Sequence, residues 1–210
     1  AGMALGGRVA VTANAAPFLV GRANEQVKID VCYARSNVKM LGINAGLAYG
    51  PLGASHHSID DIATMLGFGN VQVFAPSDAS EAEAIAEWVL AREGPVYLRV
   101  DSAALPLLHG PAYRFVPGAL DPLAEGGELA IFASGAVAAE AVAAVELLAA
   151  EGISAALYGC PSLRPFDAEA ALRAMAVCGG LALSVEEHSV HGGLGGLLAE
   201  AMADSGAGGR

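Results

Sequence analysis

The sequence predicts an α/β protein built from two mostly parallel three-layer units, each a sheet covered by helices on both faces. Short apolar segments of strand length alternate with helical segments along most of the 210 residues. This alternation is interrupted over residues 102–127, which are rich in proline and glycine. Hydrophobic residues make up 54% of the chain and charged residues only 16%, so a sizeable core is possible and a disordered chain is excluded.

The first unit is predicted to span residues 1–101. The predicted strands cover residues 9–12, 38–43, 71–75 and 96–100, and the predicted helices cover residues 21–33, residues 58–66 and a segment after Asp78. Spacing of four residues between Ala23, Val27 and Val31 indicates the first helix. Acidic residues at 60 and 61 suit the start of the second helix. A capping box begins the third, formed by Asp78 with Glu81 or by Ser80 with Glu83.

The second, smaller unit is predicted to span residues 128–210, after a linker over residues 102–127. Its predicted strands cover residues 129–133, 153–158 and 181–185, and its predicted helices cover residues 136–151, 167–178 and 193–204. Gly152 ends the long helix of this unit, and Asp167 caps the next one. The same strand-and-helix alternation therefore predicts a second parallel sheet.

Charge and cysteine content restrict the partners and the compartment. Acidic residues outnumber basic ones by 22 to 11, and this net charge of −11 argues against nucleic acid or an anionic membrane as the main partner. The sequence contains no apolar run long enough to span a membrane, and its start does not resemble a signal peptide. Cys32, Cys160 and Cys178 lie far apart without a CxxC motif, which predicts buried thiols in a reducing cytoplasm.

Three loops that follow predicted strands are candidates for a ligand site, because ligands bind at the carboxyl ends of strands in open α/β sheets. They cover residues 13–18, 46–57 and 186–193. The loop at 46–57 is the best candidate. It is too rich in turn formers to be a helix, and its glycines let a ligand approach the backbone. His56 and His57 are adjacent and should point in different directions, although an ordinary surface loop remains the alternative.

The loop at 186–193 contains Glu186, Glu187, His188 and His191, which together suggest a metal site. No HExxH pattern is present, so a structural loop is the favoured interpretation, and no metal ligand is assigned. Glycines at the start of the helix near Gly193 leave phosphate binding there as an alternative. The sequence has no GxSxG, no Walker A motif and no GxGxxG after a strand, so the residues alone leave the reaction open.

The order of the motifs resembles that of the transketolase family over nearly the whole chain. Residues 13–26, with Phe18 after a proline, resemble the first segment of the pyrimidine-binding domain, and residues 46–63, with His56, resemble its glycine-rich loop. Further matching segments are residues 76–78, 94–99, 133–135, 151–153, 164–167, 185–188 and 192–195. The second unit thus resembles the carboxy-terminal domain of transketolases.

This resemblance implies an enzyme that depends on thiamine diphosphate. Phe18 takes the position of the aromatic residue that stacks on the cofactor's aminopyrimidine, and His56 that of the histidine or glutamine near its amino group, which we assign a catalytic role in proton handling. The family's catalytic glutamate would lie upstream of Ala1, and its Gly-Asp-Gly domain for the diphosphate and Mg²⁺ is absent. The resemblance therefore implies a section or small subunit that is inactive alone and works with a diphosphate-binding partner, as a homo-oligomer or heterotetramer.

Three positions expected to bind substrate differ from the family pattern. Asn44 replaces a sugar-binding histidine, Leu52 replaces an aspartate that contacts a substrate hydroxyl, and Ser102 replaces an arginine that holds the acceptor phosphate. A bidentate arginine–phosphate contact confers both affinity and selectivity. These changes predict a small carbonyl or sugar acceptor that is less polar or unphosphorylated.

Four functions remain open from the sequence. Transfer of a two-carbon ketol unit is favoured by the spacing around Phe18. Loss of the sugar-binding residues leaves open a thiamine enzyme that decarboxylates a 2-oxoacid, such as a deoxyxylulose-phosphate synthase or the small subunit of a 2-oxoacid dehydrogenase. A non-catalytic partner chain is less favoured, because Phe18 and His56 are retained. A nucleotide-binding α/β module ranks last, because no phosphate motif is present.

Overall fold

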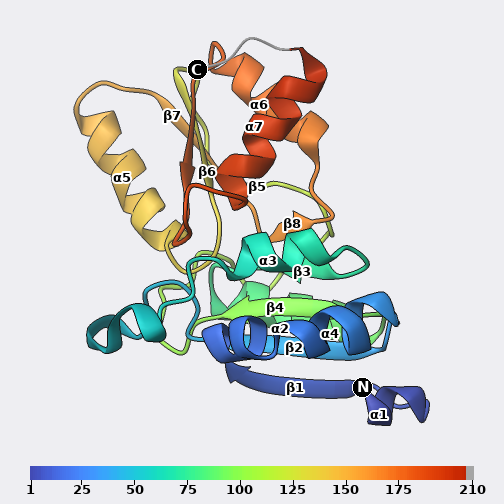
Figure 1. Ribbon diagram of the computed structural model, residues 1–210. Helices are drawn as coiled ribbons and strands as arrows, with labels where there is room; N and C mark the ends of the chain where they lie inside the picture. The colour runs from blue at the N-terminus through green and yellow to red at the C-terminus, as the bar shows by residue number, and fades with distance from the viewer. Residues whose placement is uncertain (207–210) are drawn as a thin grey trace.

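The alternation of strands and helices produces two sheets in the computed structural model, which describes residues 1–206 (Figure 1). The first sheet has the order β1-β2-β4-β3-β8. Its strands are β1 (Ala10–Ala15), β2 (Val38–Ile43), β4 (Val96–Val100), β3 (Gln72–Phe74) and β8 (Ser162–Arg164). The first four strands are parallel, and β8 pairs antiparallel with β3. The predicted strands of the first unit are therefore confirmed.

Helices cover both faces of this sheet, because successive side chains of each strand point to opposite faces. The covering elements on one face are η1 (Pro17–Arg22), η2 (Val27–Tyr33) and α3 (Asp61–Phe68). They pack against Met40, Val73 and Tyr97. On the opposite face, α4 (Ala79–Leu90) packs against Phe74 and the neighbouring residues of β4. This gives the predicted three layers.

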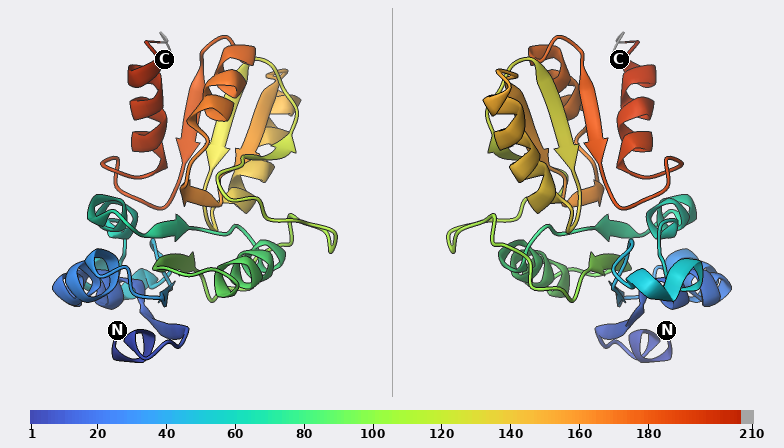
Figure 2. Two further views of the ribbon diagram at one scale, coloured as in Figure 1. Left: turned by 90° about the vertical axis from the view of Figure 1, so that its right-hand side faces the viewer. Right: turned by 90° about the vertical axis from the view of Figure 1, so that its left-hand side faces the viewer.

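The second sheet has the order β5-β7-β6-β9 and is also layered between helices (Figure 2). Its strands are β5 (Asp121–Ala124), β7 (Ala155–Gly159), β6 (Leu129–Ala133) and β9 (Ala182–Val185). Strand β6 is parallel to both β7 and β9, whereas β5 pairs antiparallel with β7. The long helix α5 (Ala138–Ala150) covers one face, and α6 (Ala168–Val177) and α7 (Leu194–Ser205) cover the other. The predicted second α/β unit is present.

Two short antiparallel strands were not predicted. Strand β5 lies inside the segment expected to be a linker, and it contains Pro122. Strand β8 follows β7 in the chain but joins the sheet of the first unit. Each has only three or four residues, so neither carries a periodic pattern, and pairing with distant strands stabilises both. Because of β8 and a shared apolar cluster, the two units have a continuous core.

The helical segments around the first two loops differ from the prediction. The helix expected over residues 21–33 begins at Pro17 and consists of three consecutive segments, of which η1 and η2 are π-helical and α2 (Asn24–Gln26) is α-helical. The prediction of a non-helical loop at residues 46–57 was wrong, because Gly50–Ser55 forms the 3₁₀ segment η3, kinked at Gly53 with φ +71°. Helix α3 begins at Asp61 rather than at 58, because Ser58 is paired through its backbone with Gly46. A short helix, α1 (Gly2–Leu5), precedes β1.

The expected cap and buried thiols are both present. The side chain of Asp78 accepts a hydrogen bond from the backbone N–H of Glu81, so Asp78 caps α4 as the first of the two boxes predicts, but the Glu81 carboxylate accepts from the N–H of Ser77 instead of that of Asp78. Cys32, Cys160 and Cys178 are free and buried. Burial raises the pKa of Cys32 to about 11 and also raises the pKa of the other two, so all three remain thiols. No helix within residues 1–206 is both long enough and apolar enough to cross a membrane.

Candidate functional site

The residues proposed to bind a cofactor or substrate follow three adjacent parallel strands. Phe18 comes after β1, Asn44 after β2 and Ser102 after β4, and the register places the ends of these strands side by side. His56 belongs to the loop that follows β2. The candidate site therefore lies at the carboxyl edge of the first sheet, where the topology of an α/β fold places ligands.

Phe18 and His56 form the centre of this site. Their ring centroids lie 5.2 Å apart and the rings meet edge to face at 71°. Tyr49 also contacts His56, at a centroid distance of 5.5 Å. The guanidinium of Arg22 lies over the Phe18 ring, 4.2 Å from its centroid, so one face of this ring already carries a planar group. Both Phe18 and His56 are partly exposed. The arrangement offers an aromatic surface with an imidazole at its edge.

The two adjacent histidines point in different directions, as predicted. The Nδ1 atom of His56 lies 3.0 Å from the hydroxyl oxygen of Ser55, while its ring faces Phe18 and Tyr49. In contrast, Nε2 of His57 lies 2.9 Å from the Gly50 carbonyl oxygen. Of the two histidines, only His56 therefore packs against Phe18 and Tyr49, whereas His57 contacts the backbone of its own loop.

Two of the three predicted substrate positions contact each other. The side-chain oxygen of Asn44 accepts hydrogen bonds from the backbone N–H of Ser102, at 3.2 Å, and from its hydroxyl. Asn44 adopts a positive φ of 52°, a conformation that asparagine tolerates better than most residues. Leu52, in contrast, lies on η3 with 55% of its surface exposed. Asn44 and Ser102 thus form a neutral polar pair at this edge of the sheet.

Two side chains of the loop at residues 186–193 make contacts that support the fold. The Glu186 carboxylate accepts hydrogen bonds from the backbone N–H groups of Leu194 and Gly195, at 2.7 and 2.8 Å. It therefore occupies the start of α7, where a phosphate had been considered. His188 accepts a hydrogen bond from the Ala63 backbone, so its imidazole connects the two units.

A buried ion pair between Asp61 and Arg99 was missed in the sequence analysis. The Nε atom of Arg99 donates to Asp61 at 3.1 Å, and Asp61 is completely buried. The hydroxyl of Tyr97 donates to the same carboxylate at 2.6 Å. Burial, followed by the charge of Asp61, raises the pKa of Tyr97, so this hydroxyl stays protonated. A charged residue within an otherwise apolar strand was the signal that could have revealed Arg99.

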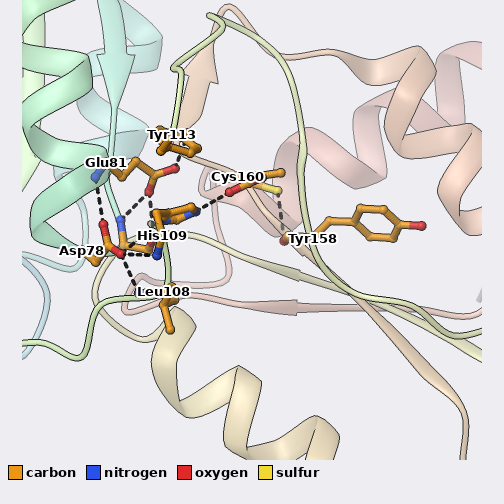
Figure 3. Close-up of polar contacts among 9 residues, drawn as sticks. Asp78, Glu81, Leu108, His109, Tyr113, Tyr158 and Cys160 are labelled. Carbon is orange, nitrogen blue, oxygen red and sulfur yellow. Dashed lines mark hydrogen bonds and ion pairs between the residues drawn. The ribbon is translucent and has the colours of Figure 1, made fainter. Parts of the chain in front are cut away.

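A second buried cluster connects α4 to the segment at residues 108–121 (Figure 3). His109 Nδ1 lies 3.0 Å from an Asp78 oxygen, and His109 Nε2 contacts Asp121. Tyr113 donates a hydrogen bond to Glu81 at 2.8 Å. Ligand atoms of Glu81, His109 and Asp121 lie within 4.8 Å of one another, a spacing that suits a metal ion. Both nitrogens of His109 already have carboxylate partners, so the geometry favours a hydrogen-bonded cluster around an imidazolium.

This cluster predicts a pH-dependent contribution to stability. Burial lowers the pKa of His109, but the hydrogen bond to Asp121 and the charges of Glu81, Asp121 and Asp78 outweigh it, so the net shift is upward. A raised folded-state pKa means that the stabilisation is fully present below the unfolded value and is lost as pH rises through the folded value. We expect His109→Gln to lower the free energy of unfolding by about 1.5–3 kcal/mol at pH 6, and by less at pH 9.

Urea unfolding of the full-length chain at the two pH values measures this difference. His191→Gln is the matched control, because His191 is exposed. An equal loss of stability at pH 6 and pH 9 for the His109 variant would contradict a charged imidazole in this cluster.

The fold and the site together define a class of protein: a two-unit α/β chain with an aromatic–imidazole pair at the carboxyl edge of a parallel sheet. Comparison with known families narrows this class. The transketolase pyrimidine-binding domain matches residues 1–106, and the transketolase C-terminal domain matches residues 118–209. The chain therefore belongs to the transketolase family.

Individual relatives show how much of a known protein the chain covers. A subunit of apulose-4-phosphate transketolase from Actinobacillus succinogenes is 52% identical over 207 residues, which are 99% of this chain and 66% of the relative. A 6-deoxy-6-sulfo-D-fructose transketolase subunit from a Clostridium species is 36% identical, over 98% of this chain and 63% of the relative. The chain thus spans slightly less than two thirds of these relatives.

A solved structure supports the same relationship. A split-gene transketolase, described as an inactive beta4 tetramer, superimposes with a TM-score of 0.90 at 37% identity. The match covers 97% of this chain and 66% of that chain. The arrangement of both units is therefore shared with a transketolase encoded by split genes.

Proposed function

We propose that this chain is the pyrimidine-binding section of a split, thiamine-diphosphate-dependent transketolase that transfers a two-carbon ketol unit between carbonyl compounds. The contact between Phe18 and His56 at the carboxyl edge of the sheet is the observation that carries this proposal. Membership of the transketolase family supports the cofactor. The free, buried cysteines fit a reducing compartment such as the cytoplasm.

The residues of the site fit the aminopyrimidine half of the cofactor. The Phe18 ring is partly exposed, and the planar guanidinium of Arg22 over one of its faces shows that the ring pairs with flat, polar groups. His56 stands at the ring edge, within reach of a substituent on that group. In our proposal Phe18 stacks on the pyrimidine, and His56 holds or moves a proton near the reacting carbons. The chemistry that thiamine diphosphate supplies when bound is a nucleophilic carbon that carries the two-carbon unit.

This proposal requires a diphosphate-binding partner chain or a further section of the protein. The sequence contains no Gly-Asp-Gly motif for the diphosphate and its Mg²⁺, so these groups are assigned to a partner chain or a further section of the protein. The names of the relatives support this arrangement, because one is named as a subunit of a transketolase and another as a split-gene transketolase. We propose an oligomer in which the partner completes the cofactor site.

The neutral pair of Asn44 and Ser102 favours an unphosphorylated acceptor. Both hydrogen-bond donors of Ser102 are directed to Asn44, and neither residue carries a positive charge for a phosphate. The relative from Actinobacillus succinogenes is named for apulose-4-phosphate, a phosphate ester, so preference for phosphate esters is the alternative outcome.

The acceptor preference is measured on the assembled enzyme, meaning the full-length chain with its diphosphate-binding partner, thiamine diphosphate and Mg²⁺. We expect a higher kcat/KM for erythrose than for erythrose 4-phosphate. Ser102→Arg should shift the ratio of the two values toward the phosphate ester by about tenfold or more, because it adds a charge-assisted contact. A wild-type preference for the phosphate ester would contradict the unphosphorylated acceptor. Turnover of a 2-oxoacid without ketol transfer would contradict the transketolase reaction itself.

A further inference from the structure

The loop that carries His56 is closed at its base by a pair of backbone hydrogen bonds. The N–H of Gly46 donates to the Ser58 carbonyl at 3.0 Å, and the N–H of Ser58 donates to the Gly46 carbonyl at 2.9 Å. His56 lies two residues before Ser58, so any movement of this base moves the imidazole. The position of His56 against Phe18 therefore depends on what holds Ser58.

Arg99 holds this base from the end of β4. Its Nη2 atom donates to the Ser58 carbonyl at 3.3 Å and to the Glu187 carbonyl at 2.7 Å. Its Nε atom is meanwhile fixed by the buried Asp61. Only 5% of Arg99 is exposed, so these contacts are made away from water, where each is stronger than at a surface. One guanidinium thus joins the His56 loop, α3 and the second unit.

The second unit also contacts the base of the His56 loop. A Cβ atom added to Gly46 would lie 2.7 Å from Cβ of Glu187, so the base of the loop is in close contact with the segment that follows β9. The backbone N–H of Ser189 donates to the Ile59 carbonyl at 2.8 Å. The loop at 186–193 therefore contacts both Gly46, which pairs with Ser58, and Ile59, which follows it, and the Arg99 side chain bonds to Ser58 and to Glu187.

We propose that Arg99 is a positioning residue for His56, and that it makes the geometry of the proposed active site depend on docking of the carboxy-terminal unit. That His56 is the residue being positioned rests on the proposed function. The shape of the guanidinium is essential to this role, because one planar fork serves Asp61 and two carbonyl oxygens, whereas a lysine ammonium is a compact point charge on a flexible stem. Lysine at this position would keep a positive charge beside Asp61 but could not donate to Asp61 and to both carbonyl oxygens at once.

Hydrogen exchange of the Arg99→Lys variant tests this role without any cofactor. In the complex of the full-length chain with its partner, we expect the amides of residues 46–58 to exchange about tenfold faster, the factor that corresponds to losing one hydrogen bond to a charged group. The amides of β6 should be unchanged. In the loaded enzyme, kcat should fall by a similar factor of about ten, with little change in the KM for the ketose donor.

Arg164→Lys is the matched control. Arg164 also donates to backbone carbonyls of the first unit, those of Met65 and Leu66, but at the far end of α3. Its variant should leave exchange at residues 46–58 unchanged. Equal exchange of this loop in the two variants and the wild type would overturn the positioning role. Because the exchange measurement uses no cofactor, failure of the wild-type assembly to bind thiamine diphosphate would overturn the proposed function alone.

Discussion

Replacing His56 by alanine in the assembled enzyme is expected to lower kcat by about 10²-fold or more, the range typical of a lost acid–base group. The expectation follows from its place at the edge of the Phe18 ring, 5.2 Å from centroid to centroid. The KM for the ketose donor should change little, since His56 is proposed to act on a proton rather than to bind the sugar. Steady-state rates at saturating thiamine diphosphate measure the effect.

Two further variants separate proton handling from loop structure. His57→Ala should keep most of the activity, because the neighbouring imidazole contacts only the Gly50 carbonyl among the contacts described. His56→Gln should recover part of the loss, since the resemblance allows either residue at this position. An alanine variant at position 56 as active as the wild type would remove His56 from the mechanism.

Replacing Arg99 by methionine is expected to cost about 3–5 kcal/mol of stability, the usual effect of leaving one member of a buried ion pair unpaired. Asp61 is completely buried and would retain only the hydrogen bond from Tyr97 among its described side-chain partners. For a chain of this size the midpoint of thermal unfolding should fall by roughly 6–20 °C. Urea unfolding of the full-length chain gives the free energy directly.

The double variant Asp61→Asn with Arg99→Met tests whether the unpaired charge is the cause. Asparagine is neutral and its oxygen still accepts from Tyr97, so the double variant should be more stable than Arg99→Met alone. Such a recovery is typical of buried ion pairs, because one unpaired buried charge destabilises the fold more than two neutral side chains do. A double variant less stable than the single one would show that packing, and not charge, accounts for the loss.

The main elements of the fold followed from local sequence signals. Short apolar segments between helical ones predicted the strands from β1 to β4, and the spacing of Asp78 and Glu81 predicted the start of α4. Asp167 was likewise expected to cap α6, and its side chain accepts from the Ala170 backbone. These signals are local because each depends on residues within one turn or one strand. The rule that carboxyl ends of parallel strands meet also predicted that the loops at residues 13–18 and 46–57 lie at one edge of the sheet, whereas Asn44 and Ser102 were named only from the family resemblance.

The features that were missed depend on contacts between distant segments. Asp61 fits the first turn of a helix, and nothing nearby in the sequence shows that it pairs with Arg99. His109 lies in a proline-rich stretch, and its carboxylate partners come from α4 and β5. Glu186 has metal-ligand chemistry, yet its carboxylate caps α7. Charged groups such as these are placed by tertiary structure, so sequence spacing gives their chemistry but not their partners.

Calorimetric titration of thiamine diphosphate into the assembled enzyme, in the presence of Mg²⁺, tests the central claim most directly. The account predicts a clear heat of binding for the wild type. Phe18→Ala should bind about tenfold more weakly or worse, because stacking on an aromatic ring contributes about 1–3 kcal/mol. Phe18→Tyr, which keeps the ring, should bind nearly as well as the wild type. No heat with the wild type, or equal affinity with alanine at position 18, would contradict a pyrimidine site at Phe18.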